Sequence, residues 1–344
     1  MARCLELARL GIGHTAPNPM VGAVLVHGDR IIGEGYHQVY GGPHAEVNCI
    51  NSVSPENISL ISSSTLFVSL EPCAHFGKTP PCADLIIEKK IPRVIVACRD
   101  PFESVNGKGI EKLEKAGIDV TVGVLEKEAI ELNKRFFTLH RKNRPYIILK
   151  WAQTADHKIA SLGRERLIIS NEFTNRKTHQ WRTEEAAILV GTNTALKDDP
   201  QLNNRLWPGK APVKLLIDLS LKVPSSAKLF SGGNTIVYNS TKSGKEGNIE
   251  WYRIDPNSSL PEQVIGHLKS QHLLSVLVEG GARLLQSFIN ENLWDEARVI
   301  TNTSLSIGPG LHAPEFLRAQ KVQKTDQIQS DLIQIFYQQD LIHH

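Results

Sequence analysis

A proline at position 145 divides the chain into two runs of alternating apolar strands and helices, and this division constrains the fold more than any other feature. Proline disfavours helical geometry at the residue before it, so Asn143-Arg144-Pro145 marks a boundary after the amphipathic segment at 126–141. Alternation of strands and helices on both sides predicts two α/β domains, each with helices covering a sheet. A chain of 344 residues has room for both, and we place them at 1–143 and 144–344.

The expected elements follow from apolar periodicity and turn residues. In the first domain, we expect strands at 21–27, 30–36, 65–70, 93–97 and 119–122, and helices at 45–51, 82–89, 109–116 and 126–141. In the second domain, we expect strands at 146–151, 187–190, 213–217 and 275–278, and helices at 172–182 and 283–290. Segments 232–233 and 242–248 are rich in turn residues and are expected as surface loops.

Charge and cysteine content narrow the class of protein. The net charge is only +3, and the basic residues are scattered, which disfavours a protein that wraps nucleic acid. No apolar run is long enough to cross a bilayer. Five cysteines do not indicate a disulfide framework in a chain of this length, so we expect a reducing, cytoplasmic location. Cys4, Cys49 and Cys98 fall within helical or strand patterns and are expected as small core residues.

The strongest chemical signal is a set of one histidine and two cysteines. His44 precedes Glu46 by two residues, and Cys73 and Cys82 are separated by eight residues. One imidazole and two thiolates make a three-ligand zinc site that keeps its fourth position open, as catalytic zinc sites do. Each of the three alone is more often an ordinary buried residue, but the complete set indicates a metal site.

Glu46 completes a reactive arrangement. A carboxylate two residues from a zinc ligand is placed to move protons during hydrolysis. His-x-Glu followed by Pro-Cys and a second cysteine is the signature of zinc-dependent nucleobase deaminases, although the short form has two residues between the cysteines. The sequence therefore predicts hydrolytic deamination in the first domain, with Glu46 as catalytic residue and His44, Cys73 and Cys82 as metal ligands.

Three segments stand out in the second domain. Segment 191–195 follows an apolar strand with small and hydroxyl residues, and segment 197–205 combines two acids with a terminal arginine. Segment 278–282 runs from a strand through two glycines into a helix, where backbone N–H groups can face a phosphate. A double glycine after a strand is more often a simple turn, and no GxGxxG motif supports a Rossmann domain.

The chain resembles the bifunctional deaminase–reductase family of riboflavin biosynthesis. In the first domain the resemblance is carried by Pro17-Asn18-Pro19-Met20-Val21-Gly22, Gly35-Tyr36-His37, Pro43-His44-Ala45-Glu46, Leu70-Glu71-Pro72-Cys73 and Pro80-Pro81-Cys82. In the second domain it ties together the three segments described above. It implies a cytidine-deaminase-like three-layer domain followed by a dihydrofolate-reductase-like α/β domain. It also implies zinc and NADPH as cofactors, a phosphorylated pyrimidine as substrate and a homo-oligomeric state.

The resemblance assigns residues to both reactions. The first is deamination of 2,5-diamino-6-ribosylamino-4(3H)-pyrimidinone 5′-phosphate, and the second is NADPH reduction of the product's ribosyl group to ribityl. The positions matching deaminase substrate contacts are Asn18, His37, His75 and Lys78. Those matching NADPH contacts are Ala152, Thr194, Asp198, Gly281, Ala282 and Arg283, within a segment that continues to residue 287. Those matching reductase substrate contacts are Lys150, Arg182, Leu202, Arg205 and Glu279.

Two segments depart from the family pattern. Residues 154–157 replace a common Ser-Leu-Asp-Gly, and residues 167–170 replace a Trp-Ile-Thr-like segment. The alternatives are therefore a zinc deaminase of another base or nucleoside, free or in nucleic acid, with a weak or inactive second domain. A zinc-stabilised binding module without turnover is a further alternative, which predicts a fourth protein ligand on the metal.

Overall fold

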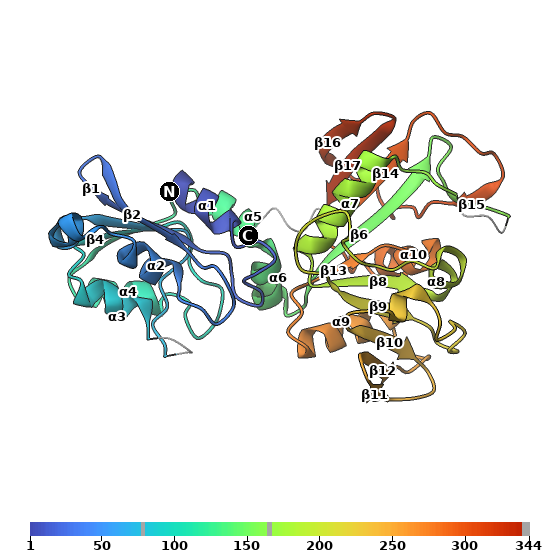
Figure 1. The fold of residues 1–344 in the computed structure, drawn as a ribbon, viewed down its shortest axis with the longest axis horizontal. Coiled ribbons are helices and arrows are strands. Elements are labelled where there is room, and N and C mark those ends of the chain that lie inside the picture. The colour runs from blue at the N-terminus through green and yellow to red at the C-terminus, as the bar shows by residue number, and fades with distance from the viewer. Residues whose placement is uncertain (77–79, 164–166, 339–344) are drawn as a thin grey trace. The chain divides into compact units, whose positions relative to one another are not determined.

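The computed structural model describes residues 1–76, 80–163 and 167–338 (Figure 1). The chain divides into two compact units, Met1–Asn143 and Arg144–His344. Arg144 is fixed within its own unit, because its guanidinium donates to both carboxylate oxygens of the buried Asp295, at 2.5 and 2.7 Å. The strands and helices expected at 21–36, 45–51 and 187–190 are present with nearly the same ends.

A five-stranded sheet forms the centre of the first unit, in the order β2-β1-β3-β4-β5. Strand β1 is antiparallel to β2 and β3, whereas β3, β4 and β5 run parallel. The strands are β1 (Gly22–His27), β2 (Arg30–Tyr36), β3 (Thr65–Val68), β4 (Arg93–Val96) and β5 (Asp119–Val122). Parallel strands place their carboxyl ends at one edge, so the loops after β3 and β4 lie close together.

Helices cover both faces of this sheet, which gives three layers (Figure 1). Ala23 and Leu25 of β1 belong to the core beneath three helices, while Val24 packs with Leu7 on the opposite face. Alternate residues of a strand point to opposite faces, so a strand covered on both sides is apolar throughout. The three helices on the first face are α2 (Ala45–Asn51), α3 (Cys82–Glu88) and α4 (Lys108–Lys115). The opposite face carries α1 (Ala2–Arg9), α5 (Glu126–Leu132) and α6 (Lys134–Lys142), and η1 (Pro55–Ser63) precedes β3.

The prediction of a single helix at 126–141 is wrong, because the helix is interrupted at Asn133, which separates α5 from α6. Asn133 is buried, and its side chain both accepts from the backbone N–H of Met20 and donates to the Met20 carbonyl, each at 2.8 Å. Helical periodicity continues through this position, so the sequence gives no sign of a tertiary contact that interrupts the helix.

The second unit is built on a ten-stranded sheet in the order β11-β12-β10-β9-β8-β13-β6-β14-β17-β16. Strands β12 to β14 in this order are parallel, and antiparallel strands lie at both edges. The strands are β6 (Tyr146–Thr154), β8 (Ala187–Gly191), β9 (Val213–Ile217), β10 (Thr235–Asn239), β11 (Gly244–Glu246), β12 (Ile249–Arg253), β13 (Ser275–Val278), β14 (Glu296–Asn302), β16 (Val322–Ile328) and β17 (Asp331–Tyr337). A separate ribbon pairs β7 (Lys158–Ser161) with β15 (Gly310–His312).

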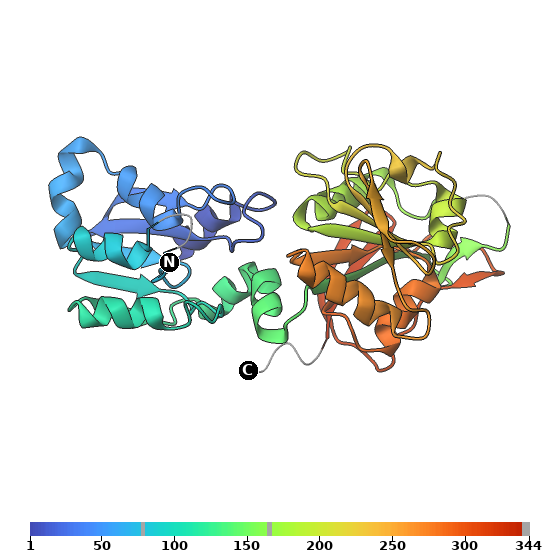
Figure 2. The same cartoon turned by 90° about the horizontal axis from the view of Figure 1, so that it is seen from below.

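Helices again cover both faces of the sheet. On one face, α9 (Leu260–Ser270) and α10 (Ala282–Asn290), orange in Figure 2, contact each other and pack into the main core. The other face carries α7 (Glu172–Glu184), α8 (Thr192–Asp198) and η2 (Lys228–Phe230). Part of the loop predicted at 242–248 is strand β11, whose three residues are all exposed and therefore show no apolar alternation. Among the described residues, no helix combines the length and the apolar character that crossing a membrane requires.

Candidate active sites

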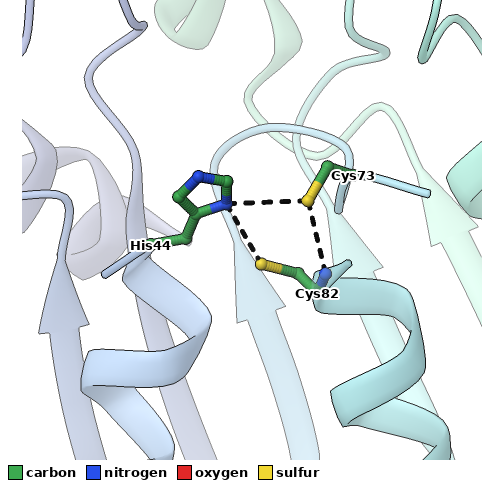
Figure 3. A group of neighbouring side chains, drawn as sticks. All are labelled: His44, Cys73 and Cys82. Carbon is green, nitrogen blue, oxygen red and sulfur yellow. Dashed lines mark hydrogen bonds between the residues drawn. The ribbon is translucent and has the colours of Figure 1, made fainter. Parts of the chain in front are cut away.

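The predicted metal ligands come from three separate elements of the first unit. His44 is the residue before α2, Cys73 follows β3 in a loop, and Cys82 is the first residue of α3. Figure 3 shows the three side chains converging above the carboxyl end of the sheet. The eight-residue insert between the cysteines is compatible with this site, because Cys82 at the start of α3 still lies next to Cys73. The Cys82 backbone N–H donates to the Cys73 sulfur at 3.3 Å.

The distances fit a zinc ion. His44 Nδ1 lies 3.3 Å from the sulfur of Cys82 and 3.6 Å from the sulfur of Cys73. Tetrahedral zinc with ordinary bond lengths separates a nitrogen and a sulfur ligand by roughly 3.6 Å. Hydrogen bonding between the thiols lowers the pKa of Cys73 and raises that of Cys82 well above its usual value, because the pair shares one proton.

No other histidine, cysteine or acid among the described residues joins this group, whose ligand atoms lie within 4.8 Å of one another. The fourth protein ligand that a purely structural zinc site requires is therefore not present in the described part of the chain. Cys4, Cys49 and Cys98 are buried outside the group, which confirms that they are core residues.

Glu46 lies in the first turn of α2 and is only 3% exposed. Burial raises the pKa of its carboxyl to about 7, and the neighbouring Cys73 adds to this shift. Glu46 does not belong to the group of metal-binding side chains, although it is two residues from His44. It is therefore a buried carboxyl beside the ligands, in a position suited to proton transfer.

Asn18 and His37 form a connected pair beside His44. His37 is buried, and its Nδ1–H donates to the Pro43 carbonyl at 3.0 Å while its Nε2 accepts from Asn18 at 3.2 Å. Burial lowers the pKa of His37, in agreement with this neutral form. Its ring meets that of His44 edge to face at 5.5 Å. Both nitrogens of His37 are thus engaged, and these bonds fix the orientation of its ring and of the Asn18 amide beside the metal ligand His44.

His75 lies in the loop after Cys73, where it is exposed and meets the ring of Phe102 at 6.1 Å. Phe102 in turn contacts His140 of α6, with 5.0 Å between ring centroids, so three rings from separate segments are in contact. Lys78 lies outside the described residues.

Glu71 was not singled out by the sequence, yet it fixes the loop that carries Cys73. Its buried carboxylate accepts four backbone N–H groups, from Asp100, Gly107, Gly109 and Ile110, at 3.0–3.3 Å. Three of these groups belong to the start of α4, whose first turn has no helical acceptor of its own. A carboxylate next to a Pro-Cys segment is a weak sequence signal, because its partners are 29–39 residues away.

The second unit contains a cavity of about 670 Å³. Nine of the residues predicted to contact cofactor or substrate line it: Lys150, Ala152, Arg182, Thr194, Asp198, Leu202, Arg205, Glu279 and Gly281. Ala282 and Arg283 do not line the cavity and instead begin α10. The residues assigned to the reductase substrate and most of those assigned to NADPH therefore line the same cavity.

Charged side chains dominate one part of this cavity. Arg182 forms two hydrogen bonds with Glu279, at 2.8 and 2.7 Å, and a third with the Asn203 carbonyl at 2.9 Å. Burial alone would raise the pKa of Glu279, but Arg182 and Lys150 lower it to about 2. Burial lowers the pKa of Lys150, although Glu279 opposes this shift. The result is a fixed ion pair beside a lysine that is easier to deprotonate than usual.

Gly280 and Gly281 provide a close backbone approach in the same cavity. Gly281 has φ 70°, a conformation that favours glycine, and a Cβ on Gly280 would lie 3.0 Å from Thr194 Oγ1. The backbone can therefore approach a ligand directly before α10 begins, which suits a nucleotide phosphate.

The sequence did not identify Thr178 and His179, which also line the cavity. Both lie on α7, and His179 shares a helical face with Arg182 three residues later. This three-residue spacing from Arg182 is the feature of the sequence that could have identified His179 as a cavity residue.

Two family models match the chain. Residues 1–98 match the cytidine and deoxycytidylate deaminase zinc-binding region, and residues 145–324 match the RibD C-terminal domain. Together with the metal site and the cavity, these matches define a class of enzyme in which a zinc-dependent deaminase is joined to an NADPH-dependent reductase.

Within this class, the chain belongs to the riboflavin biosynthesis protein RibD family. It is 40% identical to RibD of Aquifex aeolicus over 98% of this chain and 97% of that protein. It is 34% identical to RibD of Escherichia coli over 86% of this chain and 84% of that protein.

Solved structures agree with this assignment. The diaminohydroxyphosphoribosylaminopyrimidine deaminase/5-amino-6-(5-phosphoribosylamino)uracil reductase of Thermotoga maritima matches with a TM-score of 0.90 and 36% identity, covering 98% of this chain and 97% of that one. Acinetobacter baumannii RibD matches with a TM-score of 0.88 and 29% identity over the same shares. The predicted family, fold class, bifunctional enzyme type and two cofactors are thereby confirmed.

Proposed function

We propose that the chain catalyses two consecutive reactions on one phosphorylated pyrimidine. The first unit hydrolyses the amino group of 2,5-diamino-6-ribosylamino-4(3H)-pyrimidinone 5′-phosphate, and the second reduces the ribosyl group of that product to ribityl with NADPH. The observation that carries the proposal is the convergence of His44, Cys73 and Cys82 beside the buried Glu46. The Thermotoga maritima protein, named for both activities, supports it.

In the deamination, water oxygen bonds to the ring carbon, the carbon–nitrogen bond breaks and ammonia leaves. Zinc, when bound by the three ligands, supplies the means of ionising water near neutral pH. Glu46 takes the proton released from water and delivers it to the departing nitrogen. We assign Asn18, which His37 orients, and the ring of His37 to the wall that contacts the pyrimidine, and His75 and Lys78 to the sugar phosphate.

In the reduction, NADPH, when bound, would supply the hydride that C1′ takes up, while the C1′–O4′ bond breaks and O4′ takes up a proton, leaving NADP⁺ and an open ribityl chain. We assign the cofactor to Ala152, Thr194, Asp198 and the segment from Gly281 through Ala282 and Arg283. The substrate is assigned to Lys150, Arg182, Leu202, Arg205 and Glu279. The cavity supports this division, since nine of these eleven residues line it. We assign Lys150 to the reacting centre, because burial lowers its pKa and leaves its proton easier to release than that of an ordinary lysine.

We also propose a free small-molecule substrate rather than a polynucleotide, a cytoplasmic location and a homo-oligomeric state. The net charge of +3 supports the first, and the five free cysteines support a reducing compartment. Deamination assays on single-stranded RNA and DNA test the choice of substrate. Sedimentation analysis of the purified protein tests the oligomeric state.

The direct experiment incubates the protein with the diaminopyrimidine phosphate, with and without NADPH. We expect ammonia in both cases and substrate-dependent NADPH oxidation in the second. Glu46→Gln should release no ammonia yet retain zinc, and it should still oxidise NADPH when given the deaminated compound. Oxidation of NADPH by the wild type without ammonia release would overturn the proposed order.

A further inference from the structure

Among the polar side chains that helix α7 contributes to the wall of the reductase cavity, three lie within five residues: Thr178, His179 and Arg182. The role of Arg182 is defined by its ion pair with Glu279. Neither the ion pair nor the backbone of α7 uses the other two side chains. Thr178 and His179 therefore line the cavity without an assigned chemical role.

His179 is 5% exposed, and its Nδ1 is buried without a hydrogen-bond partner. Within residues 1–76, 80–163 and 167–338, neither nitrogen of its ring forms a hydrogen bond. Buried polar atoms in folded proteins are almost always paired, and an unpaired one requires an explanation. For a side chain in a cavity wall, that explanation is a partner that enters with the ligand.

The surroundings of His179 decide which ligand group suits it. Burial, with the positive Arg182 and Arg205, lowers the pKa of His179 to about 4, so the ring is neutral at neutral pH. A neutral imidazole has one donor and one acceptor, which match a hydroxyl that also donates and accepts. An anion would pair with only one nitrogen, and Arg205 already offers a full positive charge for it.

We infer that His179 binds the sugar chain of the reductase substrate, hydrogen-bonding a hydroxyl of the ribosyl group while the phosphate is held by the adjacent arginine. This inference rests on the proposed reductase function. It is specific to the substrate, because the groups that act on His179, namely Arg182, Arg205, Glu279 and Lys150, are all assigned to substrate rather than NADPH.

The test compares variants of His179 in NADPH oxidation with the deaminated substrate. His179→Phe keeps a flat ring and removes both nitrogens, and we expect the KM for substrate to rise roughly tenfold. The Kd of NADPH, measured by fluorescence titration, should stay within twofold of the wild-type value. His179→Gln restores one donor and one acceptor, so its KM should lie between the two.

Thr174 supplies a matched control on the same helix. Its hydroxyl is also buried and unpaired, but Thr174 does not line the cavity. Thr174→Val should therefore leave the KM unchanged, which separates a cavity contact from a general effect of unpaired atoms in α7.

The outcomes are distinguishable. An unchanged KM in His179→Phe, or a rise in the NADPH Kd equal to that in KM, overturns the inference while leaving the reductase assignment intact. If His179→Phe does not fold, His179→Leu, which is smaller and also lacks both nitrogens, carries the test, and a KM equal to wild type then refutes the contact. Absence of substrate-dependent NADPH oxidation in the wild type refutes the proposed function itself.

Discussion

The guanidinium of Arg182 faces the carboxylate of Glu279 through two parallel hydrogen bonds, Nε to Oε1 at 2.8 Å and Nη2 to Oε2 at 2.7 Å. Both side chains are largely buried, with exposed fractions of 12% and 7%. Removing one partner of such a pair leaves the other charge uncompensated. The pair is therefore a structural element of the reductase cavity as well as a candidate contact with substrate.

Glu279→Gln should destabilise the second unit by about 3 kcal/mol at pH 7. The pKa of Glu279 is about 2 in the folded chain against an ordinary 4.5. Its stabilising effect is therefore complete above pH 4.5 and is lost as pH falls from there toward 2, so the difference between variant and wild type should shrink over that range. All five tryptophans lie beyond residue 150, so urea unfolding followed by tryptophan fluorescence reports this unit alone.

Glu172→Gln is the control for this measurement, because Glu172 is an exposed carboxylate on the same helix as Arg182. Its free energy of unfolding should follow the wild type at every pH. A destabilisation in Glu279→Gln that stays constant from pH 7 to pH 3 would contradict the ion-pair account.

Cys82→Ser should lower the zinc content from about one ion per chain to near zero, because one of three protein ligands loses its thiolate. Deamination should be lost, whereas the Kd of NADPH should not change. Elemental analysis of the purified protein and a fluorescence titration measure the two effects. Cys98→Ala, which alters a buried thiol outside the metal group, should retain zinc, and equal zinc loss in both variants would argue against the assigned ligands.

Glu71→Gln should loosen the start of α4. An amide offers one acceptor oxygen where the carboxylate serves four backbone N–H groups, so we expect a loss of about 2 kcal/mol or more. Hydrogen exchange at residues 107–115 should become faster. Glu111→Gln changes an exposed carboxylate of the same helix, and its exchange pattern should match the wild type.

Gly281→Ala should cost roughly 1–3 kcal/mol, because φ 70° is unfavourable for a residue with a Cβ. The Kd of NADPH should rise as well, since the strained backbone begins the helix assigned to the phosphate. Gly266 in α9 is the matched control, with no atom within 4 Å of an added Cβ. Gly266→Ala should stabilise the protein by about 0.5–1 kcal/mol and leave NADPH binding unchanged. Thermal unfolding and NADPH titration of both variants check the contrast.

The metal site could be predicted from the sequence because the residue types alone define its chemistry. The types of ligand in His44, Cys73 and Cys82 restrict the possible ion, whatever the length of the insert between the cysteines. The same reasoning located Glu46. It could not find Glu71, whose role depends on backbone groups that only the folded loop brings together.

The reductase cavity was predicted less completely for a related reason. Its charged members, Lys150, Arg182 and Glu279, carry recognisable chemistry, and the structure places them together. That Arg182 is already paired with Glu279 depends on the contact between α7 and the strand end after β13. The break at Asn133 and the exposed strand β11 were missed because neither tertiary hydrogen bonds nor sheet edges leave an apolar period in the sequence.

The two hydrogen bonds between the Asn133 side chain and the Met20 backbone determine how long a fragment must be to contain the whole deaminase unit. The match to the zinc-binding region ends at residue 98, yet Phe136 and Phe137 of α6 complete a core cluster with Leu5 and Leu70. An expression fragment that stops near residue 100 exposes that cluster and releases the segment carrying Asn18. A fragment ending at Asn143 keeps both and follows the boundary of the first unit, so it is the fragment to use for studying the first reaction by itself.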